Sequence, residues 1–154
     1  MRKNPFLRAE KTVIKKVYNN EATLNINVTV RSYDNATGTF TESTEVYPRT
    51  IHIANPHEIA DGIVDKIQYL KGDLNVDVAY LEITQVMIPV LGERTVMIDG
   101  VAKTLAESRT RNGGIDETKD TITFDGTTYR IVKITPKSFY AGTPSKLKIQ
   151  LRAV

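Results

Sequence analysis

The two histidines and the acids beside them are the first residues whose types and spacing suggest chemistry. His57 stands next to Glu58, and His52 lies five residues upstream. A His/Glu pair can serve as a general base or as half of a metal site. The His-Glu-x-x-His spacing of a helical zinc site does not occur in the sequence. We therefore interpret His57 and Glu58 as an exposed helix start, where the Glu58 carboxylate complements the helix dipole.

Two groups of acidic residues offer the oxygen ligands that a hard cation prefers. The stretch from Asp73 to Asp77 begins like a calcium-binding loop, but Val78 and Thr84 stand where that loop needs glycine and glutamate. A polar strand edge explains the first group better. The second and densest group consists of Asp116, Glu117, Asp120 and Asp125. Short acidic runs are usually exposed to solvent, so we interpret this group as a solvated loop and turn while keeping it as a candidate cation site.

The residue types that covalent catalysis needs are scarce. The chain contains no cysteine, which excludes thiol catalysis, disulfides and iron–sulfur clusters. No Gly-x-Ser-x-Gly motif occurs. The glycine pair in Asn112-Gly113-Gly114 lacks the Gly-x-x-x-x-Gly-Lys pattern of a phosphate-binding loop. The sequence therefore predicts a protein that is not an enzyme and has no catalytic residue, metal or cofactor.

Length and charge favour one soluble domain with an uneven charge distribution. A chain of 154 residues fits a single domain over 1–154, and no apolar run is long enough to suggest a membrane partner. The formal net charge is +3, but residues 1–16 carry +5 and residues 130–154 carry +6 with no acid. The residues between them therefore sum to −8. Such asymmetry favours contact with nucleic acid or with an acidic partner in an assembly, or is simply solvated charge.

Alternating and β-branched residues predict a mainly β fold. Residues 23–31 alternate apolar and polar side chains, as a half-buried strand does, and a polar strand follows over 39–46. We expect 47–53 to continue this sheet and 73–90 to form one or two strands. Asp-Gly pairs predict tight hairpin turns within 95–103 and 119–134, and a last strand runs over 146–154. The count of short strands favours a small antiparallel β-barrel or sandwich with long loops.

One helix is expected, over about 56–71. Ile59, Ile63, Ile67 and Leu70 recur at helical spacing after Pro56. Asn55 is placed as the N-cap and Gly72 as the C-cap. The sequence predicts that this helix is inserted into the β fold.

Two segments and a set of single residues are candidates for contact with other molecules. Residues 1–16 are expected to form an arm or a short helix. Residues 106–117 are expected to form a mobile loop that acts in assembly or gating, because arginines there combine with flexible glycines. The candidate interface residues are Arg109, Arg111, Gly113, Gly114, Lys146, Lys148 and Arg152.

A nucleic-acid-binding barrel is the alternative from another class. Basic residues and aromatic rings on a small barrel can form an oligonucleotide-binding fold, with bases stacking on Tyr33, Phe40 or Tyr129. Aromatic residues make up only 7% of the chain, and Tyr129 alternates with Ile131 as an inward-facing residue would. These two observations weaken this alternative without removing it.

Two hairpins carry a resemblance to a known family. The turn and strands of 120–131 with the closing strand 147–151 resemble the C-terminal block of head-closure (stopper) and head–tail connector proteins of tailed bacteriophages. The strand and Thr-Gly turn of 27–42 are similar to the opening hairpin of those proteins. The two blocks cover roughly 60 residues, and hairpins of this kind are common. The chain departs from the family in its length and in the segment that follows residue 56.

The resemblance implies a structural role in the virion neck. It implies a homo-oligomeric ring, with portal or adaptor and tail proteins as neighbours, that joins head to tail and helps to retain packaged DNA. Nonspecific contact with that DNA is a further implication. Localisation would be the head–tail junction of the virion, after synthesis in the host cytoplasm. A tail terminator or adaptor at the same junction is the alternative within this class, because the extra segment leaves room for another neck role.

Overall fold

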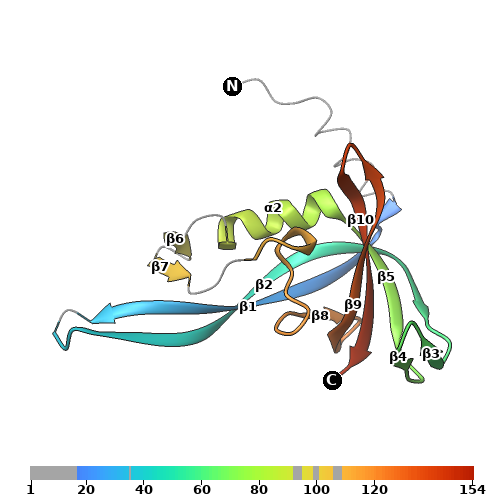
Figure 1. Ribbon diagram of the computed structural model, residues 1–154, viewed down its shortest axis with the longest axis horizontal. Coiled ribbons are helices and arrows are strands. Elements are labelled where there is room, and N and C mark those ends of the chain that lie inside the picture. The colour runs from blue at the N-terminus through green and yellow to red at the C-terminus, as the bar shows by residue number, and fades with distance from the viewer. Residues whose placement is uncertain (1–16, 35, 92–94, 99–100, 106–108) are drawn as a thin grey trace.

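The computed structural model describes residues 17–34, 36–91, 95–98, 101–105 and 109–154. The expected N-terminal arm or short helix over 1–16 lies outside the described residues. Six antiparallel strands of the described chain close into a barrel (Figure 1). In order around the barrel they are β1 (Asn20–Asp34), β2 (Thr39–Glu58), β5 (Leu74–Ala79), β10 (Thr143–Ala153), β9 (Thr127–Tyr140) and β8 (Thr121–Phe124), which pairs back to β1. The prediction of a mainly β barrel is confirmed.

The barrel interior follows the two-residue period that the sequence predicts. On β1 the side chains of Leu24, Ile26 and Val28 are completely buried, and the residues between them face outward. On β10, Leu147, Ile149 and Leu151 are equally buried. Burying each such side chain contributes about 1.5–3 kcal/mol. The alternating apolar residues of these two strands therefore fix which face of the sheet is inside.

The three expected hairpins are present. The polar strand over 39–46 belongs to β2, which pairs with β1 in one continuous antiparallel register and continues past residue 53. β8 and β9 are joined by a two-residue turn at Asp125-Gly126, where both residues have positive φ. β6 (Thr95–Ile98) and β7 (Val101–Leu105) pair antiparallel, and their Asp99-Gly100 turn lies outside the described residues. The last strand ends at Ala153.

The helix expected over 56–71 is wrong. In its place β2 runs on to Glu58, and a small hairpin follows, formed by β3 (Gly62–Val64) and β4 (Ile67–Tyr69). Pro56 lies in an irregularity of the β2–β5 ladder, a position that tolerates the missing N–H. The backbone φ of +138° at Gly62 and the positive φ of the Asp65–Lys66 turn are turn conformations that a helix cannot contain. Isoleucines four residues apart fit either structure, so the turn residues decide.

The helix lies instead in the segment where only strands are expected. Residues 74–79 do form a strand, but α2 (Tyr80–Leu91) follows directly and packs beside the barrel (Figure 1). Ile83 and Met87 are buried, four residues apart, and so face the core together. Packing of this apolar face outweighs the β propensity of the segment. Among the described residues, no helix is both long and apolar enough to cross a membrane.

A two-stranded arm projects from the barrel. Beyond Val30, β1 and β2 leave the closed part of the sheet and run on together to the pair Asp34–Thr39 (Figure 1). The ion pair of Arg31 Nε with Glu42 Oε1, at 2.7 Å, links the two strands on their exposed surface. β7 pairs with β1 only where β1 leaves the closed sheet, at Val30 and Arg31. We call residues 31–46 the arm.

Candidate interface residues

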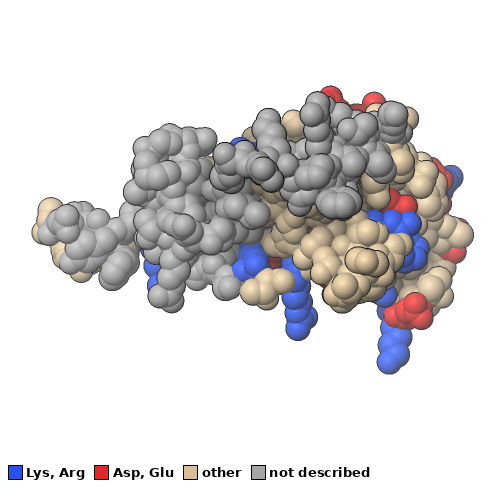
Figure 2. All heavy atoms as spheres, turned by 90° about the horizontal axis from the view of Figure 1, so that it is seen from above, with Lys and Arg blue, Asp and Glu red and all other residues tan. Residues whose placement is uncertain are grey.

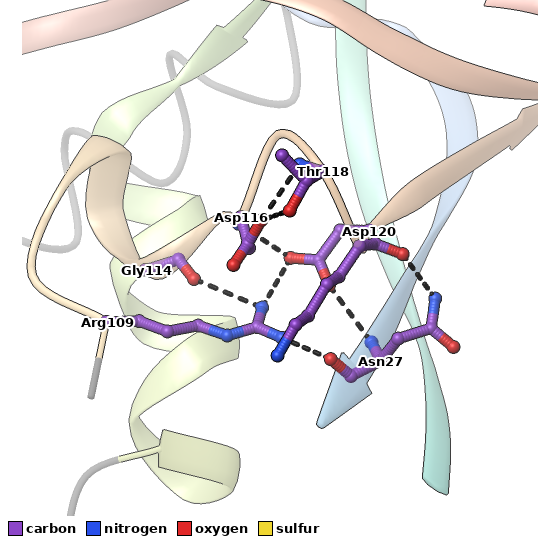
Figure 3. Close-up of polar contacts among 7 residues, drawn as sticks. Asn27, Arg109, Gly114, Asp116, Thr118 and Asp120 are labelled. Atoms are coloured by element: carbon purple, nitrogen blue, oxygen red, sulfur yellow. Dashed lines mark hydrogen bonds and ion pairs between the residues drawn. The ribbon is translucent and has the colours of Figure 1, made fainter. Parts of the chain in front are cut away.

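Arg109 and Asp120, two residues proposed from the sequence for different sites, form one buried ion pair. Arg109 Nη1 lies 2.6 Å from Asp120 Oδ2, and their side chains are 4% and 0% exposed (Figure 3). The same guanidinium donates to the backbone oxygens of Asn27 and Gly114. Asp120 in turn accepts the backbone N–H groups of Asn27 at 3.0 Å and Asp116 at 2.9 Å. The pair therefore ties the 109–120 segment to barrel strand β1.

Both carboxyl oxygens of Asp120 accept hydrogen bonds from N–H donors, and these donors favour the charged form of the carboxyl group. Burial raises the pKa of Asp120 above its ordinary value, while the N–H donors of Asp116, Arg109 and Asn27 oppose the rise. A protonated carboxyl or an amide at this position would direct its own hydrogen at another donor. The arrangement fits a charged carboxylate held by a charged guanidinium. Because Arg109 is occupied by contacts within its own chain, the structure gives it a positioning role in the fold.

Two of the other three acids of this group, Asp116 and Glu117, also have partners within the chain. Asp116 Oδ1 accepts the backbone N–H of Thr118 at 2.8 Å and its hydroxyl at 2.6 Å, and these bonds lower the pKa of Asp116. Glu117 Oε1 accepts the backbone N–H of Ile134 on β9 at 3.2 Å. Asp125 is exposed in the β8–β9 turn, apart from this cluster. Among the described residues, no cluster of three His, Asp or Glu side chains is arranged to hold a metal ion.

Gly113 and Gly114 lie in a turn beside the helix, and Gly113 makes a close contact with it. They belong to a single 3₁₀ turn, η1 (Asn112–Gly114), and have φ values of +69° and +109°. A Cβ atom on Gly113 would lie 2.9 Å from Cγ2 of Ile83 in α2. Glycine is therefore required both for the backbone conformation and for the approach. The mobility expected for the 106–117 loop stays a prediction, and residues 106–108 lie outside the described residues. Arg111 is exposed, beside a surface cavity of about 400 Å³.

The remaining candidates lie on the outer face of β9 and β10. Lys146 and Lys148 alternate with buried residues of β10, and Lys137 on β9 stands directly opposite Lys146. Lys146 Nζ reaches Asp77 of β5 at 3.9 Å. Lys133 of β9 is on the same outer face, opposite Gln150. In the view from above, Lys and Arg side chains extend from the body of the molecule into the solvent (Figure 2). The acid-free segment of the sequence therefore forms a two-stranded basic face.

Arg152, the last of these candidates, is committed to another internal ion pair. Its Nη2 lies 2.8 Å from Asp73 Oδ2 and donates to the carbonyl of Gln68 in β4 at 2.8 Å. The bond from Arg152 lowers the pKa of Asp73, whose Oδ2 also accepts the N–H of Leu70 at 2.8 Å. Asp73 is thus a fold residue and no part of a calcium loop. Together these contacts fasten the β3–β4 hairpin to the end of β10.

The histidines are separated, and each has a local partner. Glu82, in the first turn of α2, accepts the backbone N–H of His52 at 2.5 Å and contacts His52 Nδ1 at 2.8 Å. His57 Nδ1 donates to the carbonyl of Asn55 at 2.7 Å. His57 and Glu58 end strand β2, so the interpretation of the pair as a helix start is wrong. The structure brings His52 to the helix start through Glu82 instead.

The aromatic residues considered as stacking platforms are divided. Tyr129 is half-buried and packs against the core, as its alternation with Ile131 predicts. Tyr33 and Phe40 are a cross-strand pair near the end of the arm. Tyr129 thus belongs to a barrel strand, and the other two belong to the arm.

Comparison of the chain with protein-family models, with curated proteins and with solved structures finds no match. The resemblance to phage neck proteins consequently stays a prediction from the two hairpins.

Two exposed apolar patches are features that the sequence reasoning missed. Phe139 and Tyr140, at the end of β9, are 62% and 85% exposed. Ile63 and Val64, in β3, are 75% and 55% exposed. A signal was present for the first, because Ala141-Gly142 follows two aromatic residues between strands, as a hairpin turn would. No comparable signal marked the second, whose helical spacing predicted the wrong element.

Proposed function

We propose that this chain is a structural component of a tailed-phage virion neck that assembles as a ring between head and tail. The observation that carries the proposal is the arm. A closed barrel has no free sheet edge, and strand pairing with a neighbour therefore needs a segment outside the barrel. The arm is such a segment.

The arm has an edge suited to a neighbouring strand. Between Thr39 and Arg49, β2 pairs with β1 on one side, while its pairing with β5 on the other begins only at Ile53. Among the described strands nothing covers the second edge over this stretch. Backbone N–H and C=O groups on such an edge bind an added strand from another chain. An arm that reaches onto the next subunit makes a heterologous contact, and heterologous contacts that close generate rings.

The basic face supports an acidic neighbour at the same junction. Lys133, Lys137 and Lys148 on the outer face of β9 and β10 have no carboxylate partner among the described ion pairs. In the neck proposal this face meets acidic surface of the next subunit or of the adjoining ring. A tail terminator or adaptor at the same junction would use the same two features.

The arm is tested by removing it without disturbing the barrel. Val30 and Ser43 are opposite each other in the β1–β2 register. Replacing residues 31–42 by Asn-Gly would therefore close the hairpin with a two-residue turn at a paired position. We expect this variant to keep the circular dichroism spectrum of a folded β protein and to form none of the rings that the proposal expects of the intact chain in electron micrographs. The matched control is Arg31→Gln with Glu42→Gln, which keeps the arm length, removes only an exposed ion pair and is expected to leave the rings intact.

The basic face also favours a second candidate, a nucleic-acid-binding barrel. Under that alternative an oligonucleotide binds the intact chain at low salt, and affinity falls with salt in proportion to the phosphates neutralised. Salt-dependent binding that is lost in a Lys133→Gln, Lys148→Gln variant, by a chain that stays monomeric, would contradict the neck proposal. Absence of any mobility shift at low salt would contradict the second candidate.

A further inference from the structure

The two apolar patches lie at opposite ends of one strand pair. β10 begins beside the turn that carries Phe139 and Tyr140, and its other end pairs with Leu74 at the start of β5. The β3–β4 hairpin is fastened to that second end by Arg152. From Thr143 to Leu151 a strand spans about 26 Å, and the two patches lie beyond its opposite ends. In Figure 1 the β9–β10 tip and the β3–β4 hairpin accordingly point away from each other.

The tip is an ordered aromatic projection. Pairing between β9 and β10 continues out to Tyr140 and Thr143, and Ala141 and Gly142 complete the turn with φ values of +50° and +83°. The hairpin therefore holds Phe139 and Tyr140 in fixed positions while leaving most of each ring in solvent. Successive residues of a strand face opposite sides of the sheet, so the two rings lie on the two faces of the hairpin and make its end apolar on both. Single exposed apolar residues are common on soluble proteins, but two large exposed rings at the end of one ordered projection are a candidate interaction site. Aromatic anchors of this kind contribute strongly to interfaces.

The opposite end offers exposed aliphatic side chains. Ile63 lies on the face of the β3–β4 hairpin opposite to the buried Tyr69, whereas Val64, 55% exposed, alternates onto the Tyr69 face. Leu70, which follows Tyr69, is 46% exposed. Tyr69 is buried toward the barrel and bonds to Gln150, so the hairpin is anchored beneath its exposed side. The patch is therefore held in place by the fold although no part of the described chain covers it.

Charge complements the apolar match. Behind the tip, Lys137 and Lys146 stand opposite each other in a segment that contains no acid, and Asp77 of the neighbouring strand β5 lies 3.9 Å from Lys146 Nζ. The hairpin end carries three exposed carboxylates together with two lysines. These residues are Glu58, Asp61, Asp65, Lys66 and Lys71. The basic tip and the weakly acidic hairpin favour a head-to-tail arrangement and oppose contact between two tips.

We propose that the β9–β10 tip of one copy docks on the β3–β4 hairpin of another copy of this chain, so that self-association is head-to-tail. The inference deepens the proposed function, because it rests on self-assembly and names the surfaces that would join the subunits. It is independent of the arm, so loss of either contact can be measured without the other. The apolar side chains supply the affinity and the charges set the orientation.

Cysteine cross-linking tests the contact directly, because the natural chain contains no cysteine. Tyr140→Cys and Ile63→Cys chains, mixed in equal amounts under mild oxidation, are expected to form the mixed disulfide dimer in more than the twofold excess over each homodimer that random pairing gives. Val17→Cys is the control, since Val17 is 55% exposed and neighbours Tyr18, which lies near Asp77 on the barrel wall. A mixed dimer no more than twice as abundant as each homodimer, or cross-linking no greater than that of Val17→Cys, would overturn the proposal.

Sedimentation of uncross-linked chains provides the second measurement. A tip variant (Phe139→Thr, Tyr140→Thr) and a hairpin variant (Ile63→Thr, Val64→Thr) are each expected to weaken head-to-tail association by about tenfold or more. Mixing them should restore a dimer, because each variant keeps the surface that the other lacks. If the intact chain floats with anionic lipid vesicles, and only the tip variant loses this, the tip binds lipid and the proposal is overturned. Rings that persist in both variants and vanish without the arm would leave the neck proposal standing and refute this contact alone.

Discussion

The buried pair of Arg109 and Asp120 allows a quantitative test of how this fold holds its 109–120 segment. The perturbation is Asp120→Asn, which keeps the side-chain shape. The carboxylate accepts three N–H groups, from Arg109, Asn27 and Asp116. The amide has one acceptor oxygen and directs its NH₂ group at one of these donors. The positive charge of Arg109 then stays without its carboxylate partner, in a site where the Arg109 side chain is 4% exposed.

The expected cost is large because a buried charge loses its partner. Breaking a buried ion pair by removing one partner costs about 3–5 kcal/mol in free energy of unfolding. With a urea m-value of about 2 kcal/mol per molar, the unfolding midpoint should fall by about 2 M. Asp125→Asn is the matched control, because Asp125 is exposed in a turn that suits asparagine. Its expected effect is within about 0.5 kcal/mol.

A double-mutant cycle separates the pair from its surroundings. Urea titrations of Arg109→Met, Asp120→Asn and the double variant, followed by circular dichroism, give the coupling free energy. We expect the double variant to lose about 2 kcal/mol less free energy of unfolding than the two single variants lose in sum, because it leaves no unpaired charge. An Asp120→Asn midpoint as high as that of Asp125→Asn would refute this reasoning.

Three further predictions follow from individual contacts. Gly113→Ala should lower the free energy of unfolding by about 1–3 kcal/mol, because the added Cβ meets Ile83 at a backbone conformation that alanine disfavours; Asn112→Ala is a control for side-chain loss in the same turn, and an unchanged unfolding midpoint for Gly113→Ala would contradict the close contact. The pKa of Asp73 in the folded protein is below its ordinary 3.8, so the stabilisation of the fold by the charged Asp73 is complete above pH 3.8 and is lost as pH falls through the folded pKa. The difference in free energy of unfolding between the natural chain and Asp73→Asn, measured by urea titration, should therefore shrink below pH 3.8, and a constant difference would contradict the assignment. Glu82→Gln should destabilise the packing of α2 by about 1–2 kcal/mol, because a carboxylate that accepts two bonds from His52 is replaced by an amide; equal hydrogen-exchange protection of helix amides in both proteins would count against this.

The sequence predicted the barrel where local pattern and burial agree. Alternation around Leu24, Ile26 and Val28 defines an inward face, and the same alternation recurs in the last strand. Asp125-Gly126 predicted its turn because positive φ at two successive positions has few solutions. In these segments the neighbouring residues alone are sufficient to decide the structure.

The helix was misplaced because short apolar runs fit two periods. Ile63 and Ile67, four residues apart, suit a helix as well as a hairpin with a two-residue turn. Ile83 and Met87 have the same spacing and do form a helix, because both side chains enter the core. The turn residues Asp65 and Lys66 decided the first case, and contacts with distant strands decided the second.

The candidate site was predicted in parts and not as a whole. Arg109 and Asp120 were both selected, one as a mobile cation and one as a solvated acid, and the structure pairs them with each other. Their common partner Asn27 is more than ninety residues from Asp120 in sequence, a separation that no local pattern can bridge. The patches at Ile63 and Phe139 were missed because exposure depends on what the rest of the chain covers.

Electron microscopy of the purified intact chain, with particle mass determined by native mass spectrometry, tests the central claim most directly. The neck proposal predicts closed rings of one defined subunit number, which disappear when residues 31–42 are replaced by Asn-Gly. A chain that stays monomeric at every concentration, with or without the arm, would contradict it.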